Sequence, residues 1–154
     1  MKKIGEENGM WGFLIAMISG ALMSVQGVFN TGVTKQTGTW ITNCFVQLTG
    51  FLVCLMLYLF LEMGKVPVKG LFKIDNKYML LGGVIGAFIT FTVIKSMSLL
   101  GPAKAVLAIV ITQVVTAYGI ELFGLFGVDK AQFSWHKLVG MLVAVAGLFI
   151  FKWK

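Results

Sequence analysis

The sequence predicts an all-α membrane protein, and three observations lead to that class. Of its 154 residues, 58% are hydrophobic and only 12% are charged, and the mean hydropathy is +0.90. A soluble domain is about 45–50% apolar and about 25% charged, so one soluble core of this size could not hide so much apolar surface. The apolar residues also form runs of about 20 residues, the length of a helix that crosses a bilayer. No alternating strand pattern accompanies them, so we expect helices and not a barrel.

Five such runs follow one another along the chain. The expected helices cover residues of about 11–34, 40–62, 78–100, 104–128 and 137–151. Aromatic residues typical of membrane interfaces stand at the ends of the runs, namely Trp11, Trp40, Tyr78, Trp135 and Trp153. The longest polar segment, residues 63–77, is too short to fold alone, so we expect a single transmembrane domain over residues 1–154. The first run has no A-x-A cleavage site, and we expect it to be a helix and not a cleaved signal.

The first two helices each carry a pair of amides four residues apart. Gln26 and Asn30 share one face of the first helix, and Asn43 and Gln47 share one face of the second. Polar side chains in a membrane bundle face its interior or water, so these four amides, with Gln113 of the fourth helix, predict the lining of a cavity. For any single amide the alternative stays open that it holds helices together by hydrogen bonds, at about 0.6 kcal/mol per contact.

The third helix carries a stripe of two aromatic residues and a lysine. Phe88, Phe91 and Lys95 are three and seven residues apart, which places them on one face. We expect the two phenyl rings, with Tyr118 of the fourth helix, to offer flat apolar contacts to a substrate. Lys95 either lines the cavity or extends along the helix to the membrane surface. If it lines the cavity, an anionic or zwitterionic substrate is favoured over a simple cation.

The fourth helix follows a tight turn at Gly101–Pro102 and carries Gln113, Tyr118 and Glu121. Glu121 is the only carboxylate well inside an expected span, which makes it a functional candidate by default. If the helix runs to residue 128, Glu121 lies about 10 Å below the membrane surface, at 1.5 Å per residue. Burial favours the neutral acid, so this residue is the candidate for proton coupling. The alternative is an acid close enough to the interface to reach water.

Small residues mark two faces for close helix contacts. Gly82 and Gly86 have the GxxxG spacing, and the last helix carries Gly140, Ala144 and Gly147 with almost no polar atoms. Such faces let helices approach closely, so we expect them to pack at a dimer interface.

The lysines predict the orientation of the chain, which contains no arginine. Eight of them fall on the side of the N-terminus, namely Lys2, Lys3, Lys65, Lys69, Lys73, Lys77, Lys130 and Lys137. Four fall on the other side, namely Lys35, Lys104, Lys152 and Lys154. By the positive-inside rule the N-terminus is expected in the cytoplasm. Since the lysines lie between apolar runs and form no basic face, no nucleic-acid partner is expected despite the net charge of +7.

The sequence shows no pattern typical of an enzyme or of a cofactor site. His136 stands alone, and there is no HExxH, Cys/His cluster, nucleophile elbow or phosphate loop. We therefore expect no metal, no cofactor and no catalytic residues.

The chain resembles the five-helix, half-size branch of the drug/metabolite transporter superfamily over nearly its whole length. The resemblance rests on SVQGVFNTGVTKQTGTW in the first helix and on LLGPAKAVLAIVITQVVTAYGIELFGLFG, followed by KLVGMLVAVAGLFIF. The spacing from Gln113 to the acid and the FGLFG tail are its most specific parts. The family pattern would have Gly before the glutamine and Asp-His at the acid, where this chain has Thr112, Glu121 and Leu122.

The resemblance implies a secondary transporter of the inner membrane of a prokaryote that works by alternating access. Full-length relatives contain two inverted halves, so a half-size chain would pair with a second copy or with an oppositely oriented paralogue as an antiparallel dimer. In such a dimer Lys95 of one chain would lie near Glu121 of the other. We expect a proton-coupled exporter of a small organic metabolite or drug-like solute. The alternatives are a non-transporting scaffold or accessory subunit, and a channel.

Overall fold

The computed structural model describes residues 2–63, 70 and 73–152, with side chains for residues 10–63, 70 and 73–151. All regular structure in this part of the chain is helical. Four helical stretches are long and apolar enough to cross a membrane, at Met10–Thr37, Thr39–Glu62, Lys77–Leu100 and Pro102–Phe123, and a shorter apolar helix covers Trp135–Phe151. This confirms the predicted class of an all-α membrane protein with five apolar helices.

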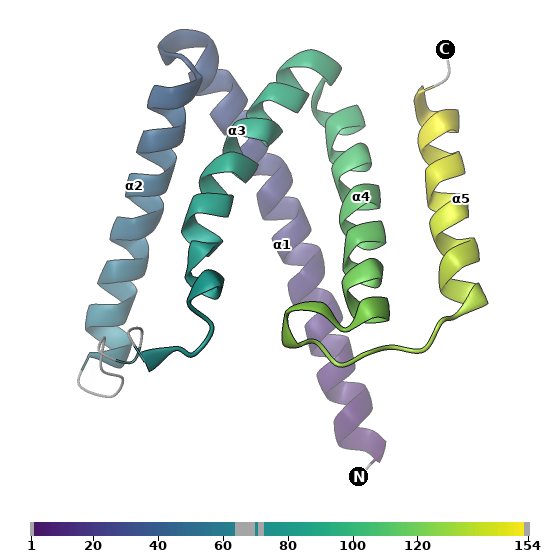
Figure 1. Ribbon diagram of the computed structural model, residues 1–154. Coiled ribbons are helices and arrows are strands. Elements are labelled where there is room, and N and C mark those ends of the chain that lie inside the picture. Colours follow the sequence, from purple (N-terminus) through teal and green to yellow (C-terminus); the bar gives the residue numbers. More distant parts are fainter. Residues whose placement is uncertain (1, 64–69, 71–72, 153–154) are drawn as a thin grey trace. The chain divides into compact units, whose positions relative to one another are not determined.

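The first compact unit, Met1–Lys95, contains α1 (Lys2–Thr37), α2 (Thr39–Leu57) and most of α3 (Gly82–Leu100). Helices α1 and α2 form a hairpin whose single connecting residue, Gly38, has a φ of 92° (Figure 1). This backbone conformation favours glycine, because a side chain there would be strained. The hairpin therefore depends on Gly38, and it sets α1 and α2 side by side.

Two irregular turns complete this unit. Helix α2 continues as a π-helical turn over Tyr58–Glu62, and α3 is preceded by a 3-10 helix over Lys77–Leu81. Together these segments match the expected spans of about 40–62 and 78–100. Lys65 and Lys69, which contribute to the predicted orientation, lie outside the described residues.

The second compact unit, Ser96–Lys154, contains the end of α3, α4 (Pro102–Phe123) and α5 (Trp135–Lys152). Gly101, with a φ of 79°, forms the expected tight turn before α4. Helices α4 and α5 pack against each other and are joined by residues 124–134 (Figure 1). Trp153 and Lys154, counted above as interfacial and topological residues, lie outside the described part.

The end of α4 differs from the expectation. The helix ends at Phe123 and not near residue 128, because Gly124 adopts a left-handed conformation with φ 63° and ψ 40°. A 3-10 turn over Leu125–Gly127 follows, in which Phe126 and Gly127 also have positive φ. The apolar composition of FGLFG resembles a helix, but its first glycine, Gly124, ends α4 as left-handed caps commonly do.

The first helix also begins earlier than its apolar run. Helix α1 starts at Lys2, where the expectation was about residue 11. No proline interrupts residues 2–10, and polar residues and the two glycines of this segment lower helix propensity without breaking the helix. The membrane-crossing portion still begins near the expected position, at Met10.

Most apolar side chains point outward on the described chain. Phe60 is 81% exposed and Ile150 is 74% exposed, whereas Asn30, Thr42 and Asn43 are buried. A soluble protein buries its apolar residues and exposes its polar ones. The reversed distribution fits a chain whose outer surface contacts lipid or a partner within the membrane.

Candidate functional site

Buried polar groups gather near the Gly38 end of the α1–α2 hairpin. The hydroxyls of Thr37 and Thr42 lie 3.1 Å apart, and Thr42 also donates to the Gly38 carbonyl oxygen at 2.9 Å. Thr42 is 1% exposed and Asn30, on the facing helix, is 9% exposed. Helical spacing could not identify Thr42 as a site residue, because its burial depends on the turn at Gly38.

Asn43 connects α2 to α3. Its side-chain Nδ2 donates a hydrogen bond of 2.9 Å to the carbonyl oxygen of Ala87, and the residue is 3% exposed. Its other polar atom, Oδ1, is buried without a hydrogen-bond partner among the described residues. Interhelical bonding is the alternative role that the sequence left open for a single amide, and Asn43 does make such a bond.

Gln47 lies one turn further along α2, beside α3. A Cβ atom added to Gly86 would be 3.7 Å from Gln47 Nε2, an ordinary van der Waals distance, so the two residues are neighbours across α2 and α3. Gly86 was expected at a dimer interface, and within the described chain it lies against α2. Gly82 has nothing within 4 Å of such a Cβ position and faces open space.

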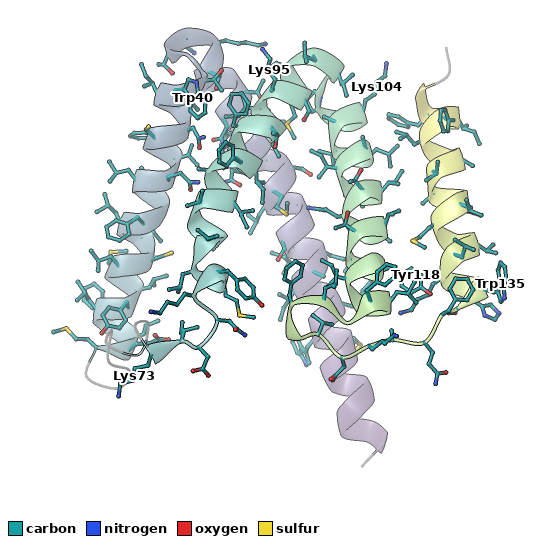
Figure 2. All side chains as sticks on the ribbon, viewed as in Figure 1. Trp40, Lys73, Lys95, Lys104, Tyr118 and Trp135 are labelled. Atoms are coloured by element: carbon teal, nitrogen blue, oxygen red, sulfur yellow. The ribbon has the colours of Figure 1, made fainter. Side chains whose placement is uncertain are left out.

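The aromatic stripe of α3 is divided between two environments. The Phe91 ring stacks on Trp40 of α2, with ring centroids 4.9 Å apart and an interplanar angle of 16°. Phe88 is 60% exposed, and Lys95 is also exposed. Figure 2 shows Trp40 and Lys95 near the same ends of α2 and α3. The sequence predicted Trp40 only as an interfacial residue. A stack between rings of two helices leaves no pattern in the sequence of either helix.

An open groove of about 560 Å³ runs between α1 and α2, and we call it the amide groove. Gln26 and Asn30 line it from α1, and Thr42, Thr49 and Cys54 line it from α2. Its apolar wall includes Phe29, Val33, Phe45, Val46 and Val53. A smaller hollow of about 440 Å³ on α1 shares Gln26, Phe29 and Asn30. The groove therefore brings together the predicted amides of α1, whereas Asn43 and Gln47 contact α3.

In the second unit, Glu121 pairs with Lys137 of α5. Glu121 Oε2 and Lys137 Nζ lie 3.0 Å apart, and the two side chains are 45% and 52% exposed. Because α4 ends at Phe123, Glu121 lies in its last turn and not about 10 Å inside the span. This corrects the expected depth of the acid. Lys137 was predicted only as a topological charge, because the sequence does not show that the segment after α4 returns to Glu121.

Tyr118 anchors the same end of the second unit. It is 8% exposed, and its hydroxyl oxygen accepts a hydrogen bond of 2.8 Å from the backbone N–H of Ser134. Lys137 Nζ lies 5.0 Å from the centre of the Tyr118 ring, within the range of a cation–π contact. Tyr118 and Trp135 lie at the same ends of α4 and α5 (Figure 2). Tyr118 was predicted as a flat substrate contact, and the structure shows it holding the segment before α5.

A second open groove, the ion-pair groove, lies between α4 and α5 and has a volume of about 410 Å³. Tyr118, Glu121 and Lys137 form its polar end, and Gly140 and Ala144 line its apolar part. Gly147 faces open space, and Gln113 is exposed outside the groove. Gln113 is therefore not brought together with Glu121 in one lining.

No group of three or more His, Cys, Asp or Glu side chains in the described residues could hold a metal ion. The polar chemistry of both grooves consists of neutral amides and hydroxyls, one phenol and one ion pair. This set can bind and orient a solute and can respond to a change of charge on Glu121.

Comparison with known families places the chain in a family of membrane proteins. A family model described as "Putative inner membrane exporter, YdcZ" matches residues 11–150, from the first turns of α1 to the end of α5. Its designation carries the abbreviation of the drug/metabolite transporters, in agreement with the resemblance of the helical motifs. Neither a curated protein nor a solved structure matches the chain.

Proposed function

The chain belongs to the YdcZ family of inner membrane exporters, a family related to the drug/metabolite transporters, and from this membership we propose that it exports a small organic solute by proton-coupled alternating access. It is a multi-pass protein of the inner membrane, and its family points to a transporter and not to an enzyme. The solute, the coupling and the assembly are the proposal.

The observation that carries the proposal is the amide groove. Polar groups inside a membrane protein are costly and mark pathways for solutes. Asn30 and Thr42 are buried at a groove of about 560 Å³, which falls within the usual size range of small-molecule sites. An amide that only joins helices would be hydrogen-bonded to a neighbouring helix, as Asn43 is, whereas Asn30 faces the open groove without such a bond.

Glu121 is the proposed coupling residue, with a mechanism that differs from that of a deep acid. Its carboxylate is partnered by Lys137, and protonation would remove the negative charge from this pair. Lys137 would then lose its partner at the start of α5, next to the segment that Tyr118 holds. Uptake of a proton at Glu121 would thus alter the contact between α4 and α5.

An antiparallel dimer supplies the two inverted halves that alternating access requires. Five spans put the two ends of the chain on opposite sides of the membrane, and a transporter site commonly lies between inverted repeats. Gly82 and Gly147 face open space and are available to a partner. The partner is a second copy or an oppositely oriented paralogue. The pairing of Lys95 with Glu121 across the dimer would compete with Lys137 of the same chain.

Transport is tested by electrophysiology on proteoliposomes fixed to a solid-supported membrane. We would apply amino acids, nucleosides, organic cations and monocarboxylates under an imposed pH gradient. The proposal predicts a saturable current for at least one class, with pH-driven current lost in Glu121→Gln. Non-saturating flux would indicate a channel, and no flux in any class would favour a scaffold.

Topology is tested by a reporter on each end of the chain expressed alone. A homodimer predicts that both ends are found on both sides of the membrane. A single orientation, with the N-terminus in the cytoplasm as the lysines predict, requires a paralogue as partner. A parallel dimer, found by cross-linking, would contradict the inverted assembly.

A further inference from the structure

The amide groove is extended along the membrane-crossing part of α2. Its lining runs from Thr42 to Cys54, about 18 Å at 1.5 Å per residue. It therefore reaches from near the Gly38 turn past the middle of the span Thr39–Glu62. A solute in it would lie at the depth where transporters hold their substrates.

Asn30 faces this groove with an unused amide. Its side chain is 9% exposed, and the structure gives it no hydrogen-bond partner among the described residues. Among the described residues, the fully buried side-chain atoms without a hydrogen-bond partner are Thr34 Oγ1 and Asn43 Oδ1, so the Asn30 amide still reaches the open groove and can bond to a ligand there. Gln26 lies one turn away on the same face and lines the same groove. A ligand with both a donor and an acceptor would satisfy these amides.

The lining of the amide groove contains no charged side chain among the described residues. In particular, Lys95 is not among its lining residues. An ion held in such surroundings would lose its hydration without gaining a counter-charge. The groove therefore favours an uncharged solute over a cation or an anion.

The walls of the groove indicate the rest of the ligand. Phe29 of α1 and Phe45 of α2 both line it, and each leaves more than half of its surface exposed. Phenyl faces and edges pack well against another flat ring. An aromatic or other flat apolar group next to an amide would match both features.

We propose that the amide groove is the solute site and that it selects uncharged molecules that carry a flat ring and an amide-like group. This assignment rests on the proposed function for its role in export, but the binding itself can be measured without transport. Asn30 recognises the polar group, with Gln26 beside it, and the two phenylalanines contact the ring.

Three probes of nearly equal shape test the selectivity, namely benzamide, which is neutral, benzamidine, a cation, and benzoate, an anion. Cys54 lines the groove and reports occupancy through its alkylation by N-ethylmaleimide, in purified Cys44→Ser protein. We expect benzamide to slow this alkylation and the two ions to slow it far less. Asn30→Leu should raise the benzamide concentration needed by about three- to tenfold, the value of one hydrogen bond.

A matched variant excludes a general loss of folding. Asn30→Asp has the same size and places a carboxylate in the groove, so protection should transfer from benzamide to benzamidine. Equal protection by all three probes, better protection by an ion, or no protection in the Cys44→Ser protein would overturn the assignment.

The result is independent of the transport test. If solute currents occur while benzamide leaves Cys54 unprotected, the proposed export is supported and the assignment of the amide groove as the solute site is wrong. If Cys54 is protected while no solute class gives a current, the binding site stands and the proposed export fails.

Discussion

The amide groove and the ion-pair groove are each formed by two neighbouring helices, but their polar groups are used differently. In the amide groove, Asn30 is buried, uncharged and without a hydrogen-bond partner among the described residues. In the ion-pair groove, Glu121 and Lys137 are charged, about half exposed and bonded to each other. Unused buried amides suit recognition of a solute, whereas an accessible ion pair suits a response to protons. The proposed function therefore assigns solute binding to α1–α2 and proton coupling to α4–α5.

Matched exchanges of acid and amide give the largest contrast between the two units. Asn43→Asp puts a carboxyl group at a site that is 3% exposed, facing the Ala87 carbonyl oxygen, and should destabilise the protein by about 2 kcal/mol. Glu121→Gln should change stability by less than about 1 kcal/mol, because the ion pair is half exposed. Thermal unfolding in detergent measures the change in stability of both variants. Equal shifts in melting temperature would contradict the expected difference between the two units.

Loss of the Tyr118 hydroxyl in the second unit should have the next largest effect. Tyr118→Phe removes the acceptor for the Ser134 N–H and should cost about 1–2 kcal/mol. Hydrogen exchange of the peptide that contains Ser134 should become faster, while Glu121→Gln, which retains Tyr118, serves as the control. Unchanged exchange in Tyr118→Phe would mean that the ion pair and not the phenol holds this end.

A smaller effect is expected from the aromatic stack of the first unit. Trp40→Leu removes the ring that stacks on Phe91, a contact worth about 0.5–1.5 kcal/mol beyond its buried area. The melting temperature should fall, whereas Trp135→Leu, which removes only an edge contact with Phe133 two residues earlier, should alter it less. The reverse order would show that the second unit limits stability.

The smallest effect on stability is expected at the ion pair itself. Lys137→Gln should lower stability by at most about 1 kcal/mol, and added salt should weaken the wild-type pair in the same direction. Comparison of unfolding at low and high salt measures this. A loss as large as that of Asn43→Asp would show that the pair is structural and would contradict its role as a responsive element.

The sequence predicted the fold better than the site. Apolar runs of membrane-spanning length and amide spacing are local patterns, so five helices and the shared face of Gln26 and Asn30 could be inferred from them. The predicted end of α4 near residue 128 was wrong, because the left-handed conformation of Gly124 ends the helix earlier. The presence of a glycine in the sequence does not reveal its backbone conformation.

Contacts between helices could not be predicted from the sequence for a related reason. The pairing of Glu121 with Lys137 spans a turn of irregular backbone, and the burial of Thr42 depends on the geometry at Gly38. Periodicity places a residue on a face of its helix but does not say which neighbour that face meets. Asn43 and Gln47 were thus predicted for one lining with Gln26, whereas they contact α3.

The proposed transport mechanism requires that the amide groove admits water and solute inside the membrane. Two cysteines at almost the same depth in the membrane test this requirement. Cys54 lines the groove, while Leu52, two residues earlier, is about 200° around the helix and is exposed outside it. In proteoliposomes we would compare alkylation by N-ethylmaleimide at Cys54, in Cys44→Ser protein, with alkylation at position 52 in the Leu52→Cys variant that also carries Cys44→Ser and Cys54→Ser. The account predicts rapid alkylation at Cys54 and little at position 52. Slow alkylation at both positions would mean that lipid or packed side chains fill the groove, and the transporter mechanism built on it would be contradicted.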